Sequence, residues 1–77
     1  MIEEETKYYL STEGYYFVFR EDRNDPRIKR ATLFSTNPNR MAAVDDVRVS
    51  EGYGLPEKSI HQIINHFESR LYLKQIE

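Results

Sequence analysis

Aromatic and β-branched residues dominate two short runs in the first part of the chain, with a polar stretch between them. The runs cover residues 7–11 and 15–21, and the three residues that separate them end in Gly14. Tyrosine, phenylalanine and valine favour strands, and a short connection that contains glycine favours a hairpin. We therefore predict two antiparallel strands. Turn-forming residues fill positions 22–27, and we predict a third strand over residues 28–35.

The spacing of apolar residues becomes helical toward the end of the chain. Positions i, i+3, i+4, i+7 and i+11 are all apolar and fall on one stripe of a helix: Ile60, Ile63, Ile64, Phe67 and Leu71. We predict that this stripe is buried, because a long helix with such a face packs across one side of a sheet.

The middle of the chain gives a weaker pattern. Asn37 followed by Pro38 is typical of a helix start, because asparagine caps free amide groups and proline fits the first turn. We therefore predict a short helix over residues 38–46. Residues 46–50 fit helical spacing and strand alternation equally well, so the sheet has three strands or four.

Together these elements predict one α+β domain over residues 1–77, in the order β-β-β-α-α. A small antiparallel sheet of three or four strands packs on one long C-terminal helix, with a short helix beside it. A chain of 77 residues has room for one hydrophobic core. The helix covers one face of the sheet, which leaves the other face for binding.

Strand alternation divides the side chains between these two faces. In the second strand, Tyr15, Phe17 and Phe19 form the more apolar set and are expected to face the helix. Tyr16 and Arg20 then point outward, away from the core. The third strand offers two alternative sets to the core, which the sequence does not distinguish: Ala31 with Leu33, or Ile28, Thr32 and Phe34.

The outward side chains combine aromatic rings with cationic groups, as contact surfaces commonly do. We expect the binding residues to be Tyr9, Tyr16, Arg20, Lys29 and Arg30. Tyrosine also favours strands for its own sake, so a partner is not needed to explain the aromatic content.

Composition narrows the class of protein. The chain has no cysteine, which excludes disulfides and thiolate metal sites and fits a reducing cytoplasm. No apolar run is long enough to span a bilayer. The net charge of −2 disfavours a polyanionic partner such as duplex DNA, although residues 20–40 carry six basic residues against three acidic ones.

Candidate catalytic chemistry is sparse. His61 and His66 are five residues apart and point in different directions on a helix, so they do not form a metal-binding pair. Asp45 and Asp46 are adjacent, which is poor geometry for a shared task, and we interpret them as a solvated face. Nucleotide-binding glycine loops and nucleophile motifs are absent from the sequence. We expect a protein that is not an enzyme and has no cofactor or metal.

Three short segments stand out along the chain: Lys7-Tyr8-Tyr9-Leu10-Ser11-Thr12, then Tyr53-Gly54-Leu55-Pro56, and the amphipathic helix that ends near Arg70. Together they resemble the small phage anti-CRISPR proteins that block type I-F surveillance complexes. The resemblance implies a small antiparallel sheet with helices. It also implies a non-enzymatic inhibitor that binds the backbone subunits of the guide-RNA complex and hinders pairing with target DNA.

Of the contacts that this family uses, one tyrosine in the first strand corresponds to Tyr9. The second strand has Arg20 where the family has a contacting tyrosine, and residues 26–51 do not align with it. We expect a phage or mobile-element inhibitor that binds a host defence complex, such as a CRISPR-Cas surveillance complex, in the host cytoplasm. The alternatives are a nucleic-acid-binding protein with a basic three-stranded sheet and an accessory subunit that pairs through a strand edge. The oligomeric state is left open.

Overall fold

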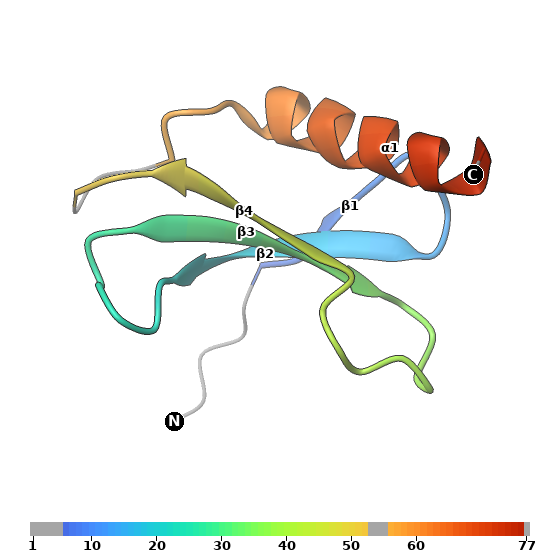
Figure 1. Cartoon of the computed structure of the whole chain (residues 1–77), viewed down its shortest axis with the longest axis horizontal. Helices are drawn as coiled ribbons and strands as arrows, with labels where there is room; N and C mark the ends of the chain where they lie inside the picture. Colours follow the sequence, from blue (N-terminus) through green and yellow to red (C-terminus); the bar gives the residue numbers. More distant parts are fainter. Residues whose placement is uncertain (1–5, 53–55, 77) are drawn as a thin grey trace.

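The computed structural model describes residues 6–52 and 56–76 and forms one α+β unit. Its elements are β1 (Tyr8–Tyr9), β2 (Tyr15–Glu21), β3 (Lys29–Ser35), β4 (Asp45–Ser50) and α1 (Ile60–Ile76). The strands form an antiparallel sheet in the order β1-β2-β3-β4, and α1 crosses one face of it (Figure 1). The predicted class and long C-terminal helix are therefore confirmed, while the observed order is β-β-β-β-α.

The first hairpin forms as its sequence predicts. Gly14 has a φ of 92°, which other residues rarely adopt, and it lies in the turn between β1 and β2. Tyr8 lies opposite Phe17, and Tyr9 lies opposite Tyr16. β1 itself spans two residues, fewer than the five predicted from residues 7–11.

The predicted short helix over residues 38–46 is wrong. The side-chain oxygen of Asn37 accepts from the N–H of Asn39 at 3.0 Å, and the N–H of Arg40 donates to the Asn37 carbonyl at 2.9 Å. These bonds make a four-residue turn with Pro38 in its second position, which proline suits as well as it suits a helix start. The chain then enters β4, so residues 46–50 are strand and the sheet has four strands.

The core lies between the sheet and α1. Phe17 and Phe67 are fully buried and their ring centroids are 5.7 Å apart. The phase of the third strand is settled in favour of Ala31 and Leu33, which belong to the core cluster beneath α1.

Most of the predicted helical stripe is buried. Ile63, Phe67 and Leu71 lie in the core, and Ile64 packs against it half-buried. Ile60, however, is 41% exposed. It is the first helical residue, and because side chains lean toward the helix N-terminus, it points past the packed part of α1.

A capping box starts α1. The N–H of Gln62 donates to Oγ of Ser59 at 3.2 Å, and the N–H of Ser59 donates to Oε1 of Gln62 at 3.2 Å. Each side chain therefore satisfies an amide that the helix leaves free. α1 therefore begins at Ile60, the first residue of the predicted apolar stripe. The Tyr53-Gly54-Leu55 part of the preceding turn motif lies outside the described residues.

Ser59→Ala should lower the free energy of unfolding by about 1 kcal/mol, because the Gln62 amide loses its acceptor. Urea denaturation measures the change. Ser59→Asp retains an acceptor and should stay near the wild type. An equal loss in both variants would contradict the capping role.

Glu68 and Arg70 of α1 make polar contacts with the strands and turns of the sheet. Oε1 of Glu68 accepts from the backbone N–H groups of Ser11 at 2.7 Å and Thr12 at 3.3 Å, in the β1–β2 turn. Nε of Arg70 lies 2.7 Å from Oδ2 of Asp45, whose side chain is 12% exposed. Asp45 is thus an ion-pair partner of the helix, and its interpretation as part of a solvated face was wrong.

Candidate functional site

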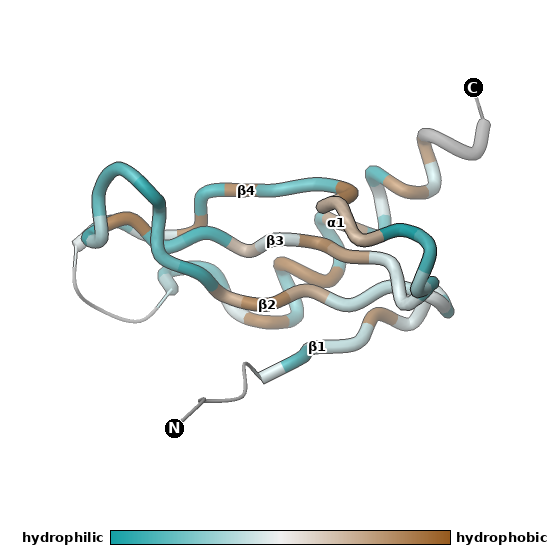
Figure 2. The backbone as a smooth tube through the Cα atoms, turned by 90° about the horizontal axis from the view of Figure 1, so that it is seen from below, coloured by the Kyte–Doolittle hydropathy of each residue, from teal (hydrophilic) through white to brown (hydrophobic). Residues whose placement is uncertain are grey.

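The sheet face opposite α1, called the open face here, carries three rungs of side chains with different character. Figure 2 views the sheet from this side. The strand register gives three rows across the sheet. The aromatic rung is Tyr9, Tyr16 and Phe34. The small rung is Val18, Thr32 and Asp46, and the arginine rung is Arg20, Arg30 and Arg48. Every second side chain of a strand points to this face, so the rungs lie next to one another along the strands.

The aromatic rung is continuous across three strands. The ring centroids of Tyr9 and Tyr16 are 5.8 Å apart, and those of Tyr16 and Phe34 are 5.7 Å apart. Tyr9 is 62% exposed, while Tyr16 and Phe34 are half-buried. Contact between neighbouring rings fixes their orientation, so they present an ordered apolar surface.

The small rung forms the floor of the open face. Val18 is 1% exposed although no helix covers it, and Thr32 is also buried. The hydroxyl of Thr32 donates to Oδ1 of Asp46 at 3.1 Å. Within the described residues no second layer covers this floor, which lies between the larger side chains of the two flanking rungs.

The arginine rung places like charges directly opposite one another, an arrangement that destabilises a sheet unless it is compensated. Nε of Arg30 lies 2.7 Å from Oδ1 of Asp22, and its Nη1 lies 3.3 Å from Oδ2 of Asp46. Arg48 pairs with Glu51, and Cζ of Arg20 lies 5.4 Å from the centre of the Phe34 ring. The rung is thus largely neutralised by acids of the adjoining loop and strand.

Hydrogen bonds lower the pKa of two acids, Asp22 and Asp25, in the β2–β3 loop. The hydrogen bond from Arg30, with a second one from the backbone of Asn24, lowers the pKa of Asp22. Hydrogen bonds from the side chain and backbone of Arg27 lower the pKa of Asp25. Each carboxylate is therefore held in its charged form by the fold, and their contribution to stability is present at neutral pH.

Acid should weaken this part of the domain. A carboxyl whose folded pKa is lowered stabilises the fold above its unfolded pKa of about 3.9 and loses that contribution as the pH falls through the folded pKa. Asp22→Asn should therefore reduce stability at pH 7 and flatten its decline below about pH 4. Urea midpoints across this range measure both effects.

Arg30→Ala provides the matched comparison, because it removes the group that lowers the pKa of Asp22 the most. The double variant should lose little more free energy of unfolding than either single variant if Asp22 and Arg30 act as a pair. Strictly additive losses would contradict the pairing.

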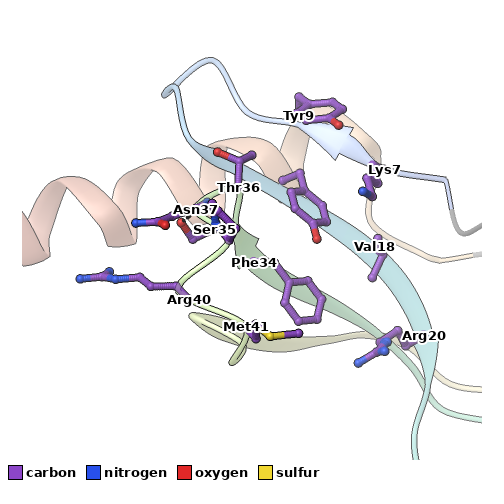
Figure 3. Close-up of a pocket in the computed structure, with 12 residues that line it drawn as sticks. Lys7, Tyr9, Val18, Arg20, Phe34, Ser35, Thr36, Asn37, Arg40 and Met41 are labelled. Carbon is purple, nitrogen blue, oxygen red and sulfur yellow. Dashed lines mark hydrogen bonds between the residues drawn. The ribbon is translucent and has the colours of Figure 1, made fainter.

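A hollow of about 640 Å³ opens over the aromatic rung and the floor. Tyr16, Val18 and Phe34 line its base. Lys7 and Tyr9 come from the side of β1, while Arg40 and Met41 come from the β3–β4 loop (Figure 3). This volume lies within the range of about 300–1,000 Å³ that ligand pockets occupy.

The sequence predicted part of this face. Tyr9, Tyr16, Arg20 and Arg30 all lie on it. Lys29 does not, because it shares the strand parity of Ala31 and its Nζ lies 3.1 Å from Oε1 of Glu21.

The predicted binding residues omitted Lys7, Phe34, Arg40 and Met41, which line the hollow. Strand alternation would have revealed Phe34 once the phase of the third strand was known. The loop residues Arg40 and Met41 gave no such signal, because their segment was expected to be a helix.

Other chemistry is limited in the described part of the chain. Its residues include no group of three or more His, Asp or Glu that could hold a metal ion. His61 is exposed on α1, whereas His66 is half-buried with its ring 5.7 Å from that of Phe67. Across residues 6–52 and 56–76, no helix has the length and apolar character needed to cross a membrane.

Compared with family models, with curated proteins and with solved structures, the chain matches none of them.

Proposed function

We propose that the protein is a non-enzymatic binding module that engages another protein through the open face. The observation that carries this proposal is the row of three contacting aromatic rings at the base of a hollow with a cationic rim. Aromatic residues and arginine supply most of the energy at the centres of protein interfaces. Rings already ordered by their neighbours also lose little conformational entropy on binding.

The first partner to test is a host defence complex of the type I-F surveillance class. This choice rests on the resemblance of residues 7–12 to the first strand of the anti-CRISPR proteins. Tyr9, which corresponds to the family's contacting tyrosine, is 62% exposed at the end of the aromatic rung. On this proposal the protein is a phage or mobile-element inhibitor that acts in the host cytoplasm by binding alone.

The experiment measures capture of a type I-F complex by the purified protein, and capture of target DNA by that complex. Tyr9→Ala and Tyr16→Ala should each weaken complex binding by about 1–2 kcal/mol, or roughly 5- to 30-fold, and restore DNA capture. Tyr72→Ala on α1 removes an equally exposed tyrosine, 64% accessible, from the opposite side of the domain and should bind like the wild type.

Failure to bind such complexes from several hosts would remove the anti-CRISPR part of the proposal. Capture of native partners from the host that survives Tyr9→Ala and Tyr16→Ala together would remove the open face as the binding surface.

A second candidate function is binding of single-stranded nucleic acid, which the aromatic rung also favours. Bases stack on exposed rings while nearby cations hold the phosphates. Acidic residues beside the arginine rung, Asp22 and Asp46 among them, oppose a continuous phosphate path. We expect no specific duplex binding at physiological salt. A strong decline of oligonucleotide affinity with salt, at micromolar affinity or better, would put this function first.

A further inference from the structure

The hollow on the open face is cationic in a chain whose net charge is −2. Its described lining residues include Lys7, Arg20 and Arg40 and no acid. Nζ of Lys7 lies 5.0 Å from the centre of the Tyr16 ring, and no ion pair is formed by Lys7 or Arg40 with any carboxylate of the described residues. Lys7 and Arg40 therefore have no partner carboxylate in the described part of the chain, unlike Arg30 and Arg48 of the arginine rung.

A second hollow adjoins the first along the strands and differs from it in charge. It has a volume of about 630 Å³ and shares Arg20 with the first. Basic and acidic side chains both line it, and Arg30 pairs there with Asp22 and Asp46. The described lining of the aromatic hollow, in contrast, holds basic side chains without an acid. An anionic group is favoured there and is repelled by the carboxylates one rung further on.

The base of the aromatic hollow suits an apolar side chain. Val18 closes the floor, and the rings of Tyr16 and Phe34 stand side by side above the sheet. On the wall, Met41 is 87% exposed, and its flexible thioether can adapt to the shape of a bound group. An apolar group on this base would have Lys7 on one side and Arg40 on the other (Figure 3).

We infer that the aromatic hollow binds an acidic peptide segment of the partner, with one aromatic side chain on its base and flanking carboxylates at Lys7 and Arg40. This inference rests on the proposed function and specifies the chemistry of the partner. A nucleic-acid strand fits less well, because its evenly spaced phosphates would continue past the aromatic rung toward Asp22 and Asp46.

The test uses the full chain and a fluorescein-labelled peptide with phenylalanine between paired aspartates and glutamates. Anisotropy measures affinity, and amide chemical shifts locate the site. The peptide should perturb β2 and residues 36–41, and its affinity should fall with added salt. Lys7→Ala combined with Arg40→Ala should weaken it by about tenfold. Lys58→Ala, which removes an exposed cation outside this hollow, should leave affinity unchanged.

Three companion probes separate the alternatives: the same peptide with alanine for phenylalanine, a peptide with lysine in place of each acid, and a short oligothymidylate. The first should bind more weakly, and the second should not bind. Tighter binding of the oligothymidylate at the same ionic strength would overturn the inference in favour of nucleic acid. Equal binding of the alanine peptide, or unchanged affinity in the Lys7 and Arg40 variant, would overturn it as well.

Failure of this inference is distinguishable from failure of the proposed function. If the acidic peptide does not bind while Tyr9→Ala and Tyr16→Ala abolish partner capture, the inference is overturned and the proposed function stands. If capture survives both tyrosine variants, the open face is not the surface that binds the partner. In that case the inference about the partner's chemistry fails with it.

Discussion

Phe67→Ala should cost about 3–5 kcal/mol of the free energy of unfolding and leave the domain largely unfolded at room temperature. Phe67 is fully buried, and its ring packs against that of Phe17 at 5.7 Å between centroids. The truncation leaves a cavity where the rings of Phe17 and Phe67 join α1 to the centre of the sheet. A domain of this size has a net stability of only about 3–5 kcal/mol, so the loss is comparable to the whole.

Far-UV circular dichroism and urea denaturation measure this effect. Phe67→Leu keeps most of the volume and should remain folded with a lowered midpoint. Tyr72→Ala, at an exposed position on the same helix, should change stability by no more than about 0.5 kcal/mol. A Phe67→Ala protein with an unchanged midpoint would show that α1 is not the lid of the core.

Glu68→Ala should destabilise the domain by about 1.5–3 kcal/mol, because two backbone amides lose a charged acceptor. The N–H groups of Ser11 and Thr12 both donate to Oε1 of Glu68. β1 has two residues paired with β2, so this contact adds to the buried Leu10 and the Tyr8–Phe17 ring contact in holding it in place. Amide hydrogen exchange at Ser11 and Thr12 should accelerate in the variant.

Glu68→Gln keeps an uncharged acceptor and should give an intermediate loss, while Ser69→Ala, at an exposed neighbouring position, should have little effect. Exchange at the β1–β2 turn that is the same in Glu68→Ala as in the wild type would contradict the anchoring role. Because β1 carries Tyr9, the alanine variant should also weaken binding through the open face. On the proposed function, the helix therefore affects the binding surface without forming part of it.

The sequence predicted the hairpin and the long helix because each packs one face against the core and turns the other face away from it. Alternation placed Tyr15, Phe17 and Phe19 toward the helix and Tyr16 and Arg20 away from it, as the register shows. β3 gave no such signal. Ala31, Thr32 and Leu33 are all buried, because α1 covers one side of this central strand and the flanking rungs cover the other. A strand covered on both faces has no alternation to read.

The segment over residues 38–46 was misjudged for a different reason. Asparagine followed by proline is compatible with both a helix start and a tight turn, and local residues alone do not choose between them. Here Val44 donates its N–H to the Leu33 carbonyl at 2.8 Å, which leads the chain into pairing with β3. Pairing with β3 therefore determines that this segment is a turn followed by a strand. Because local residues do not reveal that pairing, the sequence pattern also did not predict Arg40 and Met41 as the wall of the hollow.

The turn over residues 37–40 is stabilised by bonds within itself, from Asn39 to the Asn37 side chain and from Arg40 to the Asn37 carbonyl. Arg40 and Met41 follow this turn and are exposed. Residues of this kind can change without disturbing the core, since surface loops tolerate substitution far better than packed strands. On the proposed function, changes in this loop alone can therefore alter which partners the protein recognises, while the aromatic base of the hollow stays intact with the sheet.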